Sequence, residues 1–228
     1  MKIRKVFTSI TAALTVGAIL SFPLNGFSAN NFDSAQNMEY GKIYNGDLNS
    51  DNHTDIYKFT VDTMSVVLLS LESDADYMYY HIYKNKQIPA ITSLTTLTKN
   101  PQTNKCETYQ RFILEKGDYY LTVNRELAYD GSYSFNVKEI ALGDVNADGC
   151  VNAVDASKVL TAYASKATGN GLGLTIEQIA AADISNDVKI TDVKSVATVD
   201  AVDASLILSY YAYTATGGTQ TVEEFLGL

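Results

Sequence analysis

Apolar and polar residues alternate with a period of two over residues 30–140. In the run Ile56–Val61, for example, Tyr57, Phe59 and Val61 share one face. Alternation of this kind, carried by β-branched and aromatic residues, predicts half-buried strands. Several such strands separated by turn signals predict an all-β sandwich, with residues 88–105 as a long loop. The same pattern recurs in Val66–Leu71, Tyr77–Tyr83, Arg111–Leu114, Tyr119–Val123 and Gly131–Val137.

From residue 141 onward the apolar residues change to helical spacing, and the sequence contains an internal repeat. The segment Ala153–Leu160 (AVDASKVL) returns as Ala201–Leu208 (AVDASLIL). A match over so many core positions indicates a duplicated loop-and-helix unit. Capping-box patterns predict two further short helices, Thr175–Ala182 and Thr221–Leu226. Residues 141–228 are therefore predicted to form a small all-α domain.

Acidic residues stand at alternate positions in front of the first repeated helix. Loop positions 1, 3, 5, 7, 9 and 12 hold Asp144, Asn146, Asp148, Cys150, Asn152 and Asp155. This is the ligand order of an EF-hand, with Asp in place of the usual Glu at position 12 and the backbone carbonyl of Cys150 at position 7. Ca²⁺ takes six or more oxygen ligands, and Gly149 at position 6 permits the sharp turn. We therefore expect Ca²⁺ in this first loop.

The loop in front of the second helix departs from that order. Val188 replaces the glycine, and Asp203 follows Asp183 by twenty residues instead of eleven. The extra residues, roughly Asp192–Asp200, are expected to loop out, at a cost of only ~0.6 kcal/mol per doubling of loop length. A second Ca²⁺ site is expected here, with weaker binding. Its expected ligands are Asp183, Ser185, Asp187, the carbonyl of Lys189, and Asp203.

The motif Gly143–Gly149 (GDVNADG), together with Asp155 and the duplicated helices, resembles the type I dockerin family over residues 141–228. The resemblance implies paired calcium loop-helix units that bind a cohesin module of a scaffold protein in a cellulosome-like assembly. It also implies recognition residues at loop positions 10 and 11 and further along each helix. On this sequence they are Ala153, Val154, Leu160, Thr161, Ala201, Val202, Leu208 and Ser209. The Ala-Val pairs imply an apolar recognition patch, and the duplication permits two docking orientations.

Residues 30–140 resemble the bacterial pre-peptidase C-terminal domain in the segments Asn31–Ala35, Asp55–Val61, Leu114–Val123 and Gly131–Phe135. That family is a small, jelly-roll-like sandwich found beside secreted enzymes, and the resemblance implies that this part of the chain is not catalytic. The fold class expected for the whole chain is thus multidomain, with an all-β sandwich at residues 30–140 and an all-α calcium-binding dockerin at residues 141–228.

Candidate chemistry in the sandwich is sparse, because no nucleophile elbow, metalloprotease motif or phosphate loop is present. Two alternatives stay open. Glu72, Asp74 and Asp76 are close enough in sequence to supply a glycosidase carboxylate pair. The aromatic run Tyr77–Tyr83 offers a sugar-stacking platform if its rings are exposed.

The N-terminus predicts a secreted protein. Lys2, Arg4 and Lys5 precede an apolar stretch that ends in small residues, which is typical of a signal peptide over residues 1–29. An uncleaved membrane anchor is the alternative. The formal net charge of −9 argues against a nucleic-acid partner and suits divalent cations. Cys106 and Cys150 fall in different predicted domains and either pair or stay free.

These observations predict a secreted, non-catalytic component of a cellulosome-like assembly, anchored to a scaffold cohesin by a Ca²⁺-dependent dockerin. After signal cleavage no membrane partner is expected, and polysaccharide is a further candidate ligand. The alternative is a small secreted polysaccharide-binding or hydrolytic accessory protein whose activity lies in the sandwich.

Overall fold

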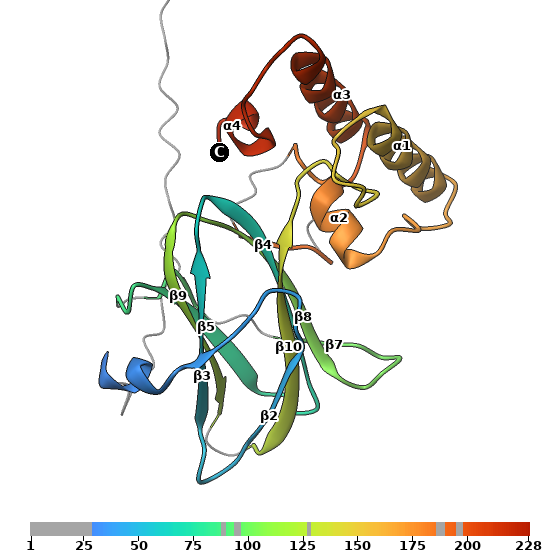
Figure 1. Cartoon of the computed structure of the whole chain (residues 1–228). Coiled ribbons are helices and arrows are strands. Elements are labelled where there is room, and N and C mark those ends of the chain that lie inside the picture. The colour runs from blue at the N-terminus through green and yellow to red at the C-terminus, as the bar shows by residue number, and fades with distance from the viewer. Residues whose placement is uncertain (1–28, 88–89, 94–96, 127–128, 186–189, 195–197) are drawn as a thin grey trace, which may run out of the picture.

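The computed structural model describes residues 29–87, 90–93, 97–126, 129–185, 190–194 and 198–228 (Figure 1). The predicted signal peptide lies, apart from Ala29, outside the described residues. Within the described ranges, no helix has both the length and the apolar character needed to cross a membrane.

Two β-sheets form the body of the molecule, and the first has the strand order β1-β3-β9-β5-β6. The chain enters it through a short 3-10 helix, η1 (Ala29–Ser34), where Phe32 packs against Tyr83 and Tyr120. The strands of this sheet are β1 (Gln36–Asn37), β3 (Thr54–Val61), β9 (Gly117–Arg125), β5 (Met78–Lys84) and β6 (Thr92–Ser93).

The second sheet has the order β11-β8-β4-β10-β2, and a short strand, β7, also pairs with β8. Its neighbouring strands are antiparallel throughout. The strands are β11 (Ile190–Asp192), β8 (Cys106–Leu114), β4 (Ser65–Ser73), β10 (Gly131–Ile140), β2 (Tyr44–Leu48) and β7 (Thr98–Lys99).

The period-two pattern of the sequence places apolar side chains between the sheets. On β4, for example, Val67, Leu69 and Leu71 join the core that both sheets enclose. All the predicted strand segments lie in or overlap observed strands, and the predicted loop at residues 88–105 contains, in its described part, only the two-residue strands β6 and β7. The β-sandwich architecture is therefore confirmed.

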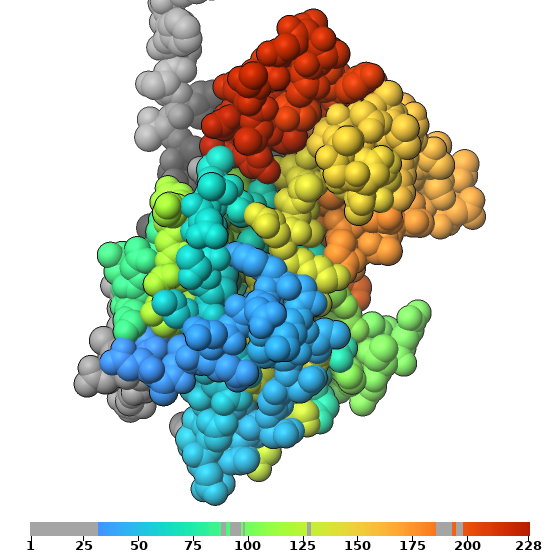
Figure 2. All heavy atoms as spheres, in the orientation of Figure 1, coloured from blue at the N-terminus to red at the C-terminus, as the bar shows by residue number. Residues whose placement is uncertain are grey.

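The C-terminal part of the chain is helical, with α1 (Ala153–Ala167), α2 (Ile176–Ala182), α3 (Ala201–Ala215) and α4 (Val222–Leu226). The two repeated helices, α1 and α3, pack against each other. Figure 2 shows them side by side in a lobe at one end of the sandwich. Each of the four helices begins with a capping box, at Asn152, Thr175, Asp200 and Thr221.

A second apolar core joins the helices to the second sheet. On β4, the residues that alternate with the sandwich core, Val66 and Leu68, point to the opposite side. There they belong to the same buried cluster as Val159 of α1 and Ile207 of α3. β10 ends at Ile140 and all four α-helices follow it, but the two parts of the chain share this core and β11 returns to the second sheet.

The insertion in the second loop differs from the prediction that it loops out. Residues Ile190–Asp192 form β11, which pairs antiparallel with β8 at the edge of the sandwich, and Val193 and Val199 are buried. Asp200 caps α3 just as Asn152 caps α1, so Asp200 is the equivalent of loop position 9. The extra residues therefore precede Val199. The inserted segment does not loop out, because burial of apolar residues such as Val193 is more favourable than leaving them in water.

The two cysteines are free. Cys106 is buried at the start of β8, and Cys150 is exposed in the first loop. Burial, together with the neighbouring carboxylate of Asp76, raises the pKa of the Cys106 thiol.

Candidate calcium loops and docking face

The carboxylate of Asp155 ties the start of the first loop to the start of α1. It is fully buried, and its Oδ1 accepts hydrogen bonds from the backbone N–H groups of Val145 (2.9 Å) and Asn146 (3.1 Å). Its Oδ2 accepts from the backbone N–H of Asn152 at 3.0 Å. Loop position 12 therefore holds both ends of the loop together.

The loop folds around the carboxylate of Asp144, which is at loop position 1. Its two carboxylate oxygens accept from the backbone N–H groups of Asp148 (3.1 Å) and Gly149 (2.9 Å). Ala147 and Gly149 have positive φ angles of 59° and 85°. A residue with a Cβ adopts this left-handed region only at a cost in free energy, which Ala147 bears and the glycine at position 6 avoids.

The donor chemistry of the first loop fits Ca²⁺. Asp144 and Asp155 are both buried, and within the described residues no lysine or arginine pairs with either. Backbone N–H groups compensate these carboxylates in part, and the two buried negative charges also favour a cation beside them. No three His, Cys, Asp or Glu side chains of the described part are gathered into a metal site by themselves. Ca²⁺ would therefore also need the Asn146 amide oxygen and the Cys150 carbonyl, which are hard oxygen ligands.

The second loop has the same three backbone hydrogen bonds to the carboxylate of loop position 12, despite its insertion; we call this arrangement the latch. The Oδ1 of Asp203, which is fully buried, accepts from the backbone N–H groups of Ile184 and Ser185, both at 2.9 Å. Its Oδ2 accepts from the N–H of Asp200 at 2.8 Å. Asp183 is also fully buried, and Ser185 is exposed. The predicted ligands Asp187 and Lys189 lie outside the described residues.

A buried arginine from the sandwich reaches the second loop, which sequence reasoning missed. The Nη1 of Arg111, on β8, donates to the carbonyl oxygens of Ala180 and Asp183, each at 2.7 Å. Its Nη2 lies 3.7 Å from the Asp183 carboxylate. Burial lowers the pKa of Arg111, while Asp183 and Asp203 act in the opposite direction. The available signal was a charged residue between Tyr109 and Ile113 on the outward face of a predicted strand.

The predicted recognition residues lie on the exposed sides of α1 and α3, two helices that pack against each other. All eight of them are exposed: Ala153, Val154, Leu160, Thr161, Ala201, Val202, Leu208 and Ser209. Sequence reasoning missed two exposed tyrosines, Tyr163 and Tyr211, although they occupy equivalent places in the repeat. We call the large apolar residues of this surface the docking face, and their exposed fractions run from 42% to 60%: Val154, Leu160, Tyr163, Val202, Leu208 and Tyr211.

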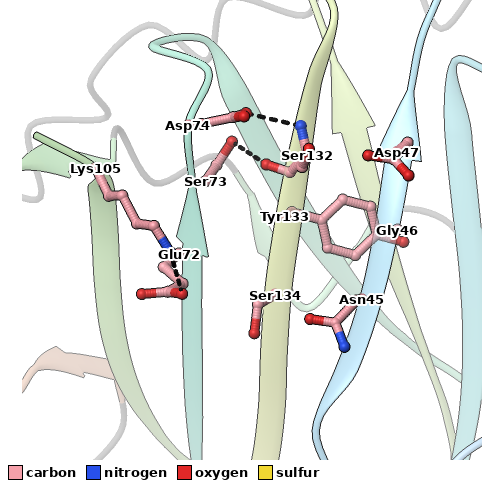
Figure 3. A pocket seen from close by; sticks show the side chains of 10 residues that line it. All are labelled: Asn45, Gly46, Asp47, Glu72, Ser73, Asp74, Lys105, Ser132, Tyr133 and Ser134. Carbon is pink, nitrogen blue, oxygen red and sulfur yellow. Dashed lines mark hydrogen bonds and ion pairs between the residues drawn. The ribbon is translucent and has the colours of Figure 1, made fainter. Parts of the chain in front are cut away.

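The carboxylates considered for glycosidase chemistry are held in structural contacts. Two of them line a shallow hollow of about 320 Å³ on the second sheet, between β2, β4 and β10 (Figure 3). Glu72 pairs with Lys105 at 2.7 Å, Asp74 accepts from the N–H of Ser132 at 2.7 Å, and Asp76 pairs with Lys99 at 3.1 Å. The hydrogen bond from Lys99 lowers the pKa of Asp76, the opposite of what a general acid needs.

The aromatic run Tyr77–Tyr83 does not form a continuous exposed platform. One side of it joins the sandwich core, and on the other side Tyr83 is covered by Phe32. Tyr77 is exposed just before β5, and its ring centroid lies 4.4 Å from that of the exposed Tyr129. Among the described residues of this run, Tyr77 is therefore the one exposed ring, and it pairs with Tyr129.

Comparisons with known proteins found little to set beside this geometry. No family model matches the chain, and no curated protein matches it. Among solved structures, the chain is similar to the pre-peptidase C-terminal domain of a collagenase from Bacillus anthracis. The match has 24% sequence identity and a TM-score of 0.38, and covers 46% of this chain and 94% of that domain.

Proposed function

We propose that this chain is a secreted, non-catalytic docking protein, whose helical part resembles a dockerin and binds a scaffold cohesin in a Ca²⁺-dependent manner. The sandwich is then the cargo that the helices attach to the scaffold. The observation that carries the proposal is the docking face, where two packed helices expose the same three apolar residues.

The duplication of the docking face supports a binding role. Val154, Leu160 and Tyr163 on α1 return as Val202, Leu208 and Tyr211 on α3. Single exposed apolar residues need no explanation, but a repeated group of them on adjacent helices marks an interaction surface. The tyrosines suit such a surface because they combine a large apolar area with a polar tip.

Calcium supports this role by ordering the first repeat. The helices are short, and helices of this length are marginal on their own in water. An ion beside Asp144 and Asp155 would neutralise buried charge and fix the start of α1 in the position that the latch already defines. Part of the free energy of ion binding is then free energy of folding.

A binding assay with charged variants tests the proposal. The full chain is probed against an array of cohesins with Ca²⁺ and with a chelator. We expect capture in Ca²⁺ and its loss with the chelator. Leu160→Glu combined with Leu208→Glu should weaken binding by at least roughly 30-fold, because the loss of even one central apolar contact costs ~2 kcal/mol or more. The control is Ile43→Glu, which changes an exposed residue of the sandwich and should bind like the wild type.

Two results would contradict the proposal. Unchanged binding by the double variant would place recognition elsewhere on the molecule. Capture that is equally strong with and without chelator would show that binding does not depend on Ca²⁺.

The exposed tyrosine pair favours polysaccharide binding as a second candidate function. Tyr77 and Tyr129 are exposed residues of the sandwich whose rings lie next to each other. Flat aromatic faces stack on sugar rings. Retention of the chain by insoluble polysaccharides, lost in Tyr77→Ala with Tyr129→Ala, would support this function, and equal elution of variant and wild type would exclude the pair as a sugar site.

A further inference from the structure

The two loops make the same backbone latch in different electrostatic surroundings. Asp155 and Asp203 each accept three backbone hydrogen bonds from equivalent positions of their repeats. Beside Asp155, however, no basic side chain of the described residues forms an ion pair, whereas Asp183 faces a guanidinium. The repeats are therefore equivalent in geometry and not in charge.

The guanidinium belongs to Arg111, which is itself fully buried. It caps the end of α2 through the carbonyl oxygens of Ala180 and Asp183, and its Nη2 faces the Asp183 carboxylate. Its Nε and Nη2 make no hydrogen bond to the described residues, so the charge of Asp183 and Asp203 is what favours the cation in this place. An arginine buried this completely is rare unless it is paired.

We propose that Arg111 of the sandwich is the built-in cation of the second loop, so that the chain binds Ca²⁺ at the first loop alone. This inference rests on the proposed function, because it assumes that the first loop takes the ion. The sandwich then orders the second repeat by a fixed charge, and Ca²⁺ orders the first.

A Ca²⁺ ion in the second loop and the guanidinium of Arg111 would repel each other, because both are positively charged. A Ca²⁺ ion ligated by Asp183 and Asp203 would lie close to the buried guanidinium. Two charges a few ångströms apart inside a protein repel by several kcal/mol, even with the effective dielectric of partly buried sites. We expect the second loop to bind Ca²⁺ at least roughly 100-fold more weakly than the first.

Calorimetric titration of the full chain with CaCl₂ counts the ions directly. The wild type should bind one. Asp155→Asn should lose it, and the matched variant Asp203→Asn, which alters the same three backbone contacts in the other repeat, should keep it. If the wild type binds two ions, the proposed function stands and the inference fails. If it binds none, the proposed function fails. One ion that is lost in Asp203→Asn and kept in Asp155→Asn also overturns the inference.

Substitution of the arginine tests the role of its charge. Arg111→Met leaves Asp183 and Asp203 without a buried cation, so this variant should gain a second ion, and Ca²⁺ should raise its Tm by more than it raises that of the wild type. Arg111→Lys keeps the positive charge and should still bind one. If Arg111→Met binds one ion and its Tm responds to Ca²⁺ as the wild type does, the guanidinium does not take the place of Ca²⁺ in the second loop. Should Arg111→Met fail to fold, the ion count of the wild type and the paired Asp variants decides.

Discussion

The attachment of the helices to the second sheet can be tested at Leu68. Its side chain is fully buried on the outward face of β4, in the core that contains Val159 and Ile207. Leu68→Ala removes one of the buried side chains that the sheet contributes to this core, next to Val66, and leaves the inner face of β4, with Leu69, unchanged. We expect the helices to lose stability although none of their own residues is altered.

The magnitude follows from the complete burial of Leu68. Replacing a buried leucine by alanine costs about 2–5 kcal/mol, because apolar contact is lost and a cavity remains. For a chain of this size each kcal/mol lowers Tm by roughly 2–4 °C, so a cost of about 3 kcal/mol corresponds to roughly 6–12 °C. The matched control is Leu160→Ala, the same change at an exposed residue, for which we expect a stability change within about 0.5 kcal/mol.

Amide hydrogen exchange shows where the stability is lost. In Leu68→Ala the amides of α1 and α3 should exchange faster than in the wild type, at positions far from residue 68 in sequence. If their exchange is unchanged and only strand amides respond, the helices do not depend on the sheet and the shared core is not a stabilising contact.

Three further predictions follow from single features. Gly149→Ala should lower the free energy of unfolding by about 1–2 kcal/mol, because φ is 85°. The cost is backbone strain alone, since no neighbour lies within 4 Å of the added Cβ. Gly149→Asn should cost less, because asparagine tolerates this conformation better, and Tm measurements would show the difference. Removing Ca²⁺ should lower the free energy of unfolding by about 2.7 kcal/mol relative to Ca²⁺ at 100 times its dissociation constant, which denaturant titrations with and without chelator would measure. The hydrogen bond from Lys138 (2.5 Å) lowers the pKa of Glu177, so this contact between sheet and helix stabilises the fold above the unfolded pKa of about 4.3 and is lost as pH falls through the lower folded pKa. The Tm difference between wild type and Glu177→Gln should accordingly be present at pH 7 and shrink as pH falls below about 4.3.

Most of the fold could be predicted from local patterns in the sequence. The alternation in Ile56–Val61 identifies a strand because one face is buried and the other is not, and the capping boxes at Thr175 and Thr221 locate helix starts because they satisfy backbone N–H groups. The exposure of Leu160 and Leu208 agrees with what the dockerin resemblance implied, and the two residues occupy equivalent places in the repeat.

Contacts between the two parts of the chain were not predictable in the same way. The inserted segment gave no sign that it would pair with β8, because edge pairing depends on which strand end lies nearby in three dimensions. Arg111 looked like one polar residue of a strand, and its partners, Ala180 and Asp183, are some seventy residues away in sequence. Charges that meet across a domain boundary leave no local pattern.

The sequence repeat and its surroundings have different symmetry, and this bears on docking. The large exposed apolar residues of α1 and α3 match one for one, so under the proposed function the docking face by itself would accept a partner in either of two orientations. Beneath it, the second repeat is attached to the sandwich by β11 and by Arg111, while the first loop has neither contact among the described residues. Loss of Ca²⁺ should therefore loosen α1 more than α3. A partner that docks mainly through Leu208 and Tyr211 would then keep part of its affinity in the presence of a chelator, whereas one that docks through Leu160 and Tyr163 would lose it.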